Sequence, residues 1–269
     1  MAIIELVNDP QKAQQLAQLL AEVWGEKNSI SVDVIIAVVH SGGYASLAIS
    51  ELSGKRQTVG GSLALVGRHD NKLHSHVTGI RSDLRNSGLG SALKQHQWAW
   101  AKENDFAAIS WTFDPLVRRN AHFNLVTLGA KVVSYHRDFY GELDDVINSG
   151  DNTDRLVVER QVAGCDIAPH AETVTSEDGE ELIETPHDIV ALRQSGESAD
   201  QATVRKARLA QREKFESAFD ASKFVRGFTA DDADRTEQLL VGIAQQEHVG
   251  AVIAIDRLES AMSVHRDAT

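Results

Sequence analysis

A short glycine-containing turn constrains this chain more than any other feature. Its residues are Arg85-Asn86-Ser87-Gly88-Leu89-Gly90; a strand-like run, residues 73–80, precedes it, and a helical run follows it to about residue 104. Two glycines one residue apart let the backbone turn tightly and expose consecutive N–H groups. At a helix start, unpaired donors and the helix dipole favour an anion. The sequence therefore predicts an anion-binding turn between a strand and a helix.

Other interpretations of the turn are weaker. A dinucleotide site would need a third glycine where Leu93 stands, together with repeated parallel strand–helix units. A P-loop would need Gly-Lys-Ser/Thr after four residues, which is absent. A purely structural turn remains the alternative. The place between strand and helix favours phosphate, with the turn residues and Ser91 as its ligands.

The periodicity of residues 1–162 predicts one mixed α/β domain. A helix is favoured for residues 32–39 because Gly42-Gly43 follows as a stop signal, and Ser53-Gly54-Lys55 is typical of a hairpin turn. The expected strands are 3–7, 44–51, 58–66, 73–80, 107–113, 131–139 and 156–162, and the expected helices are 10–24, 32–39, 88–104 and 118–128.

The chain beyond residue 162 divides into two further parts. Residues 163–181 are acidic and poor in large apolar side chains, which is typical of a linker. Residues 182–269 predict a smaller α+β extension, with helices from Pro186 and over 200–219 and paired strands over 224–228 and 237–241. No motif identifies a role for residues 242–269.

Charge and composition exclude several classes of function. The net charge of −12 argues against non-specific nucleic-acid binding, and residues 163–269 carry most of it, with 11 basic against 21 acidic residues. No apolar run is long enough to cross a bilayer, and no signal peptide is visible. The single cysteine, Cys165, fits a reducing compartment. We expect a cytoplasmic protein without nucleic-acid or membrane partners.

The predicted order of elements and the turn resemble the GNAT acyltransferase superfamily, which uses acyl-coenzyme A. Its signature, Arg/Gln-x-x-Gly-x-Gly/Ala after the fourth strand, is met by residues 85–90. The resemblance implies that the amides of this loop hold the pyrophosphate of coenzyme A and that Ile80 offers backbone groups to the pantetheine arm. Acetyl-CoA or another acyl-CoA would be the co-substrate, and no metal is implied.

A bacterial branch of predicted acetyltransferases resembles the chain more closely, over about residues 1–241. The shared segments are His74-Ser75-His76, Gly88-Leu89-Gly90 with Leu93-Lys94, residues 111–116, Arg119-Asn120-Ala121-His122-Phe123-Asn124, Leu128-Gly129-Ala130, Tyr135, Tyr140-Gly141, Asp154-Arg155, Arg208-x-x-x-Arg212, Phe215, Phe219 and Val225-x-Gly227-Phe228.

Acyl transfer to an amine needs a group that removes a proton. His74 and His76 occupy alternate strand positions, which places both on one face just upstream of the turn. Arylalkylamine N-acetyltransferases carry a similar His-x-His that serves proton removal. Hydrogen bonding within the sheet is the alternative role. A metal site that adds His69 to the pair lacks an acidic or cysteine ligand, so no metal is expected.

The acid that usually protonates the leaving thiolate is missing. In the superfamily a tyrosine lies four residues before the glycine that ends this helix, and Leu125 stands there. Tyr135 and Tyr140 are the candidates to replace it, although strand tyrosines often serve only in packing. Of the two, we place Tyr140 in the candidate site as the proton donor.

Several polar residues could contact the ligands. Asp114 ends a strand where the superfamily's sheet opens, so it could orient a histidine, pair with the substrate ammonium, or merely cap the next turn. Asn120 and Asn124 share a helix face that, by the resemblance, lies against the pantetheine arm. Arg208 and Arg212 could clamp a carboxylate, although pairing with nearby acids is the favoured interpretation.

The sequence as a whole predicts a GNAT-type N-acyltransferase acting on a small amine by direct attack. An amino acid is the preferred acceptor, because the paired arginines could hold its carboxylate, and the acyl group could be acetyl or succinyl. A homodimer is a possible assembly. The alternatives are a non-catalytic acyl-CoA-binding or scaffold protein, favoured by Leu125, and a protein lysine acetyltransferase, favoured by the acidic C-terminal part.

Overall fold

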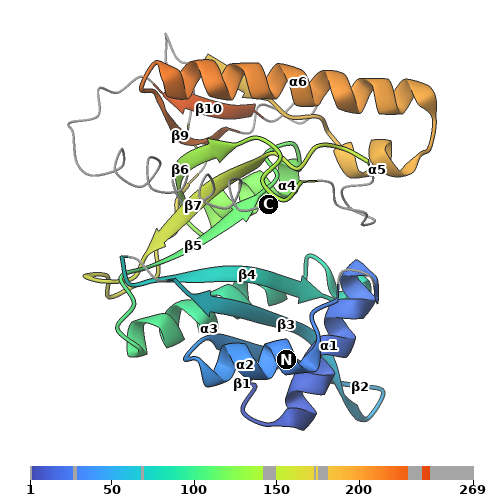
Figure 1. The fold of residues 1–269 in the computed structure, drawn as a ribbon, viewed down its shortest axis with the longest axis vertical. Coiled ribbons are helices and arrows are strands. Elements are labelled where there is room, and N and C mark those ends of the chain that lie inside the picture. Colours follow the sequence, from blue (N-terminus) through green and yellow to red (C-terminus); the bar gives the residue numbers. More distant parts are fainter. Residues whose placement is uncertain are drawn as a thin grey trace, which may run out of the picture.

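The fold is that of a computed structural model of the chain (Figure 1). The structure describes residues 2–26, 29–67, 70–141, 150–172, 174 and 181–229, and the backbone of 238–242. Among these, a larger mixed sheet and a smaller three-stranded sheet lie one after the other along the chain.

The larger sheet has seven strands in the order β1-β2-β3-β4-β5-β7-β6. All neighbouring strands pair antiparallel except β4 and β5, which are parallel. The strands are β1 (Ile3–Leu6), β2 (Tyr44–Leu52), β3 (Lys55–Val66), β4 (Lys72–Ile80), β5 (Ala108–Phe113), β6 (Lys131–His136) and β7 (Arg155–Gln161). The predicted mixed α/β class and the order of its elements are confirmed.

Local signals determine the helices of the first part. In α1 (Pro10–Trp24), proline occupies the first turn and the Asp9 carboxylate caps the helix by accepting from the Lys12 N–H at 2.8 Å. The segment over residues 32–39, for which the sequence favours a helix, forms α2 (Val32–His40) as predicted. The hairpin turns at Ser53 and Gly54, whose φ angles of 52° and 72° are typical of a tight two-residue turn.

The helix after the glycine turn and the crossover after β5 also follow the prediction. The first is α3 (Leu89–Glu103), preceded by a short 3-10 turn, η2 (Ser82–Leu84). The second begins as α4 (Arg118–His122) and continues as a π-helical turn, η3 (Phe123–Thr127), before Gly129. Gly129 has a φ of +59°, which ends the helix without a steric penalty.

The C-terminal part forms the second sheet and two helices. Its elements are β8 (Glu181–Glu184), α5 (Ile189–Gln194), α6 (Ser198–Asp220), β9 (Phe224–Thr229) and β10 (Gln238–Gly242). The sheet order is β8-β10-β9, both pairs antiparallel, so the predicted pairing of the last two strands is confirmed. Helix α6 extends along the outer side of this part (Figure 1).

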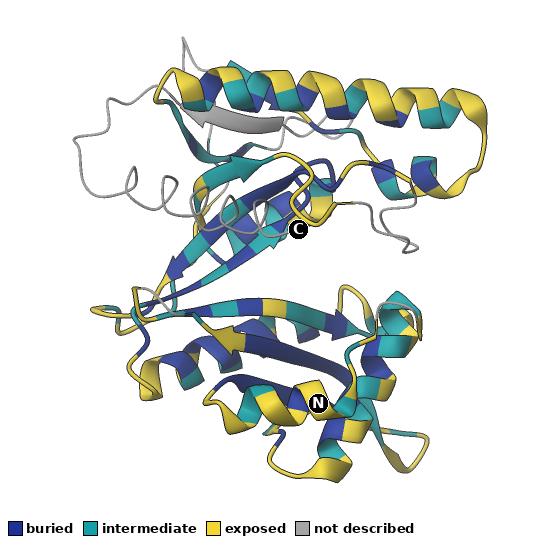
Figure 2. Ribbon diagram, viewed as in Figure 1, coloured by how far each residue is buried: buried dark blue, intermediate teal, exposed yellow. Residues whose placement is uncertain are grey.

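The C-terminal part shares a core with the first. Phe215 and Phe228 belong to the same buried cluster as Trp98, Trp111 and Leu156. Figure 2 shows buried positions recurring along the face of α6, with exposed ones between them. The described part of the expected linker also packs, since Pro169 accepts from the Arg160 guanidinium at 2.9 Å. The extension is therefore anchored to the first part by packing and hydrogen bonds.

Candidate functional site

The glycine turn has the geometry of an anion cradle. Gly88 is the residue before α3 and has a φ of +82°, a conformation that glycine adopts most readily. The first backbone bond of the helix runs from the Ala92 N–H to Gly88. Within the described residues, no acceptor binds the backbone N–H groups of residues 87–91. These donors lie together at the positive end of the helix dipole.

The surroundings of the turn also suit an anion. Arg85 is exposed and forms no ion pair with any described residue. Ser87 uses its hydroxyl to stabilise the loop, donating to the Leu84 carbonyl at 2.7 Å. A Cβ atom at Gly90 would lie 3.2 Å from Ile80, so a small residue is needed where the turn passes the end of β4. The predicted phosphate ligands therefore converge on one loop.

Strands β4 and β5 separate before β4 reaches this turn. Their parallel pairing covers only three pairs of residues and ends at His74 and Ser110. Beyond that point the β5-facing edge of β4, as far as Ile80, has no strand partner in the described sheet. Unpaired N–H and C=O groups on such an edge can bind an extended, amide-containing ligand. Ile80 lies at the end of this open edge, so its backbone groups could bind the pantetheine arm as expected.

His74 and His76 lie on the same face of β4, as predicted. Their ring centroids are 6.4 Å apart. The register between β3 and β4 shifts at this point, because Val77 pairs with Leu63 and Ser75 with Ala64, which leaves His76 in a β-bulge. Burial lowers the pKa of both imidazoles, and neighbouring His76 and Lys94 lower that of His74 further. Both rings are therefore mainly neutral near pH 7, the form that can accept a proton.

Lys94 is a buried residue of this region that sequence reasoning did not select. It lies on the inner face of α3, and its Nζ donates to the Ser75 hydroxyl at 2.7 Å. The same atom lies 4.5 Å from the ring centroid of Trp111 on β5. Burial and the nearby Arg160 lower the pKa of Lys94 to about 7. The sequence does hold a signal for Lys94: it lies one helical turn after Gly90, on the side of the helix that the apolar pattern predicts to be buried.

Of the roles considered for Asp114, the structure shows the capping of the next turn, because its Oδ1 accepts from the Leu116 N–H at 2.9 Å. Its carboxylate is 6% exposed, and it accepts from Arg193 at 2.7 Å and from Arg208 at 2.9 and 3.0 Å. Asp151 completes this buried cluster by accepting from both arginines. Burial alone would raise the pKa of Asp114, but Arg208 and Arg193 outweigh it and hold the pKa well below its usual range. Because its oxygens are occupied, Asp114 holds α5 and α6 against the end of β5 rather than a substrate ammonium.

The two asparagines differ in exposure and in contacts. Asn124 is buried; its Oδ1 accepts from the Trp111 indole N–H and its Nδ2 donates to the Asn120 carbonyl, both at 2.7 Å. The Asn124 amide thus already holds the indole in place, and its predicted contact with the pantetheine arm stays a prediction. The side chain of Asn120 is exposed, and its predicted contact with the pantetheine arm stays a prediction.

The two candidate acids also lie in different environments. The Tyr135 hydroxyl donates to Asp154, and burial together with this carboxylate raises its pKa. Tyr140 is more exposed, and its hydroxyl lies 2.9 Å from that of Thr112. Since His74 pairs with Ser110 and side chains alternate along a strand, Thr112 lies on the same face as the histidines. A role of Tyr140 in the site stays a prediction.

The paired arginines of α6 form ion pairs with acids, the interpretation that the sequence favoured. Arg208 binds Asp114 and Asp151, and Arg212 makes two bonds to Asp154, at 2.6 and 2.9 Å. These contacts fix α6 to the first part of the chain. They also remove the reason for preferring an amino-acid acceptor, since the carboxylate clamp is already filled.

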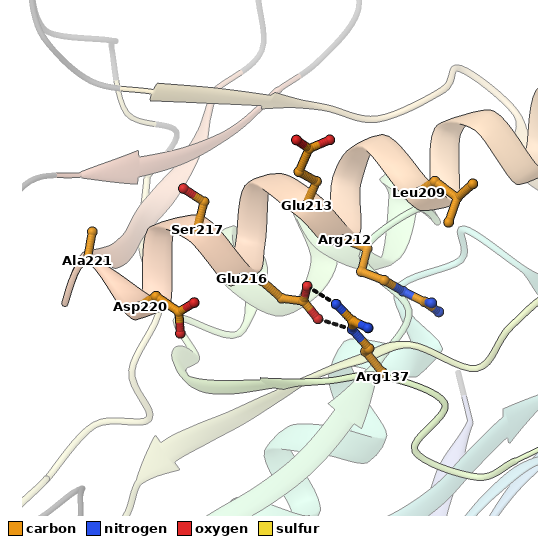
Figure 3. Close-up of a pocket in the computed structure, with 8 residues that line it drawn as sticks. All are labelled: Arg137, Leu209, Arg212, Glu213, Glu216, Ser217, Asp220 and Ala221. Atoms are coloured by element: carbon orange, nitrogen blue, oxygen red, sulfur yellow. Dashed lines mark hydrogen bonds and ion pairs between the residues drawn. The ribbon is translucent and has the colours of Figure 1, made fainter.

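A surface hollow of about 820 Å³ lies along the outer side of α6 (Figure 3). Arg137 forms an ion pair with Glu216 across it, and Arg212 lies at its edge. Apart from Arg212, none of the candidate residues lines it. Within the described part of the chain, no group of three or more histidine, cysteine, aspartate or glutamate residues could hold a metal ion, and no helix is long and apolar enough to cross a membrane. His69 lies outside the described residues.

Solved structures of acetyltransferases resemble this chain, whereas no protein-family model and no curated protein matches it. The ribosomal-protein-S18-alanine N-acetyltransferase from Escherichia coli is 12% identical over 62% of this chain and 99% of its own, with a TM-score of 0.48. A Bacillus subtilis acetyltransferase in complex with CoA is 17% identical over 59% and 97%, with a TM-score of 0.46. Aminoglycoside 6'-acetyltransferase type Ii is 18% identical over 61% and 99%, with a TM-score of 0.48.

With identities this low and TM-scores below 0.5, the assignment of the fold rests on the order of its elements. That order, the parallel pair that separates, and the glycine turn that begins α3 are those implied by the resemblance to the GNAT superfamily. The chain has a GNAT-type fold.

Proposed function

We propose that this protein is an acyl-CoA-dependent N-acyltransferase that transfers an acyl group, most simply acetyl, to a small amine. The row of N–H groups at residues 87–91, which have no acceptor among the described residues, carries this proposal, because it follows the end of β4 that has separated from β5. A pyrophosphate is an anion that such a row of donors can hold. The acceptor would approach the face that bears His74 and His76.

The residues present fit coenzyme A. The N–H groups of the turn and the free Arg85 would hold the pyrophosphate, and the open edge of β4 at Ile80 would bind the pantetheine amides. When bound, acyl-CoA supplies the activated thioester. The protein's part is to place that thioester between the two strands and beside the histidines.

His76 is the favoured base. Of the two residues, His76 at the bulge is the more accessible to an acceptor, while His74 is half-buried. A neutral imidazole at this place would accept the proton that the acceptor amine loses as it attacks. Because burial lowers the pKa of His76, the base would already be deprotonated near neutral pH.

Binding of coenzyme A to a glycine variant of the turn tests the site. We expect Gly88→Val to weaken CoA binding at least 50-fold in calorimetry, because valine strains a positive φ and covers the N–H groups. Gly54→Val is the matched control: Gly54 also has a positive φ and open space around it, but lies in the β2–β3 turn. Equal CoA affinities of Gly88→Val and wild type would refute the site.

A non-catalytic acyl-CoA-binding protein is the second candidate. The observation that favours it is Leu125, which is buried where the superfamily's tyrosine would donate a proton. Release of thiol from acetyl-CoA separates the candidates. Dependence on a small amine supports the proposed enzyme, dependence on lysine-rich peptides supports a protein acetyltransferase, and CoA binding without any amine-dependent release supports the binding protein.

A further inference from the structure

Lys94 lies at the fork between the two separating strands. The last pair joins His74 to Ser110, and the Lys94 ammonium contacts the next residue on each strand. It donates to Ser75 on β4 and lies over the ring of Trp111 on β5. A single side chain of α3 therefore spans the point at which the sheet opens.

The charge of Lys94 has no counter-charge in the described protein. Lys94 is 8% exposed, and no described carboxylate forms an ion pair with it. The charged and titratable groups that act on it are Arg160 from β7 and His74 from β4, while β5 presents the Trp111 ring. A buried ammonium without a partner is unfavourable. This position is therefore suited to an anion that comes from a ligand.

The proposed reaction creates such an anion and lacks its usual proton donor. Leu125 cannot donate a proton, and it lies next to Asn124, which holds the Trp111 indole. Trp111 thus connects the fork lysine to the π-helical turn where a tyrosine would stand. Lys94 on α3 and Leu125 on η3 both lie on the side of the sheet that carries Ser75 and Trp111, opposite the face of the histidines.

We propose that Lys94 donates a proton to the thiolate that leaves during acyl transfer, an inference that rests on the proposed function. The bond between the acceptor nitrogen and the acyl carbon forms, the carbon–sulfur bond breaks, and its electron pair stays on sulfur. Lys94 Nζ gives its proton to that sulfur, and the histidine base takes one proton from the amine. The histidine then returns its proton to Lys94 through solvent, so no net proton is gained or lost.

The acidity of Lys94 supports this role. Its pKa of about 7 lies near those of thiols, about 8.5 for cysteine, whereas an ordinary lysine would hold its proton too firmly. A thiolate formed beside it would stabilise the ammonium until the proton moves. Proton transfer at neutral pH is therefore feasible for this lysine and would be slow for an exposed one.

The test compares Lys94→Met, Lys94→Gln and Lys94→Arg with Lys102→Met. Lys102 is a matched control on the same helix: its Nζ lies 5.5 Å from the ring centroid of Trp98, but it is exposed and near Asp166. Calorimetry with CoA and with desulfo-CoA at pH 8 reports the contact between Lys94 and the CoA sulfur without turnover. Wild type should prefer CoA about tenfold, because the bound sulfur and Lys94 Nζ share one proton in a hydrogen bond, and Lys94→Met and Lys94→Gln should lose this preference.

The rates of acyl transfer should change in parallel with the preference for CoA. Removing the proton donor should lower kcat about 100-fold and abolish the fall in rate above pH 7, whereas Lys102→Met should match wild type. Lys94→Arg should keep the preference for CoA but not recover the rate, because a guanidinium does not release its proton. A Lys94→Met or Lys94→Gln enzyme with wild-type rate and preference overturns the inference, as does full rescue by arginine. A wild-type protein that binds neither compound overturns the proposed function itself.

Discussion

At the scale of single residues, the two histidines of β4 should determine the acidic side of the pH profile. A base must be neutral to act, so the rate should rise with pH through the lowered pKa of His76. We expect His76→Ala to reduce kcat by about 100-fold at pH 7 and to remove this acidic limb, with CoA affinity intact. His187→Ala, an exposed histidine near α5, serves as the control. An unaltered pH profile of His76→Ala would exclude it as the base.

Lys94 should reduce stability in a pH-dependent way. An unfolded lysine keeps its proton to about pH 10.4, while folded Lys94 releases it at about 7. Between these values the unfolded chain binds more protons, so stability rises with pH, and below pH 7 the whole penalty is present.

Lys94→Met should remove that penalty. Its Tm should exceed that of wild type by roughly 5 °C below pH 7, with the gain shrinking toward pH 10, because a hydrophobic side chain replaces an unpaired buried charge. Thermal unfolding at a series of pH values measures the effect. A Tm difference that does not vary with pH would contradict the burial of a charged lysine.

At the scale of elements, the cluster of Asp114, Asp151, Arg193 and Arg208 joins α5 and α6 to the end of β5. Asp114→Asn would leave two buried guanidiniums sharing Asp151, and we expect a loss of about 3 kcal/mol and a fall in Tm of roughly 10 °C. Asp166→Asn, which removes an exposed carboxylate, should change Tm by about 1 °C at most. Equal Tm values for the two variants would show that the cluster does not hold the helices.

The same cluster has a defined dependence on pH. Because the folded pKa of Asp114 is depressed, its contribution to stability is complete above the ordinary carboxyl pKa of about 3.9. It is lost only as the pH falls below that value toward the folded pKa. Near neutral pH the stability of the wild type should therefore not vary through this group.

The sequence predicted the elements well because their signals are local. The glycine pair, the Pro10 helix start and the Ser53-Gly54 turn each lie within a few residues of what they determine. The ion pairs of Asp114 and the indole contact of Asn124 were not predictable in this way. The Asp114–Arg208 contact joins residues 94 positions apart, and the Asn124 contact depends on how an indole on β5 faces a helical turn. The β-bulge at His76 likewise depends on the register of its partner strand.

At the scale of the whole molecule, the shared core predicts cooperative unfolding. Phe215 and Phe228 pack with Trp98 and Trp111, so the C-terminal part should not unfold separately from the first. We expect one calorimetric transition in the full chain, with equal calorimetric and van't Hoff enthalpies. Two resolved transitions would contradict the shared core.

Amine-dependent release of thiol from acetyl-CoA tests whether the protein is an N-acyltransferase. The purified wild type would be mixed with acetyl-CoA and, in separate reactions, small amines, amino acids and lysine-rich peptides. We predict release with at least one small amine, loss of that release in Gly88→Val, and its retention in Gly54→Val. Tight CoA binding by the wild type with no amine-dependent release in any reaction would contradict it.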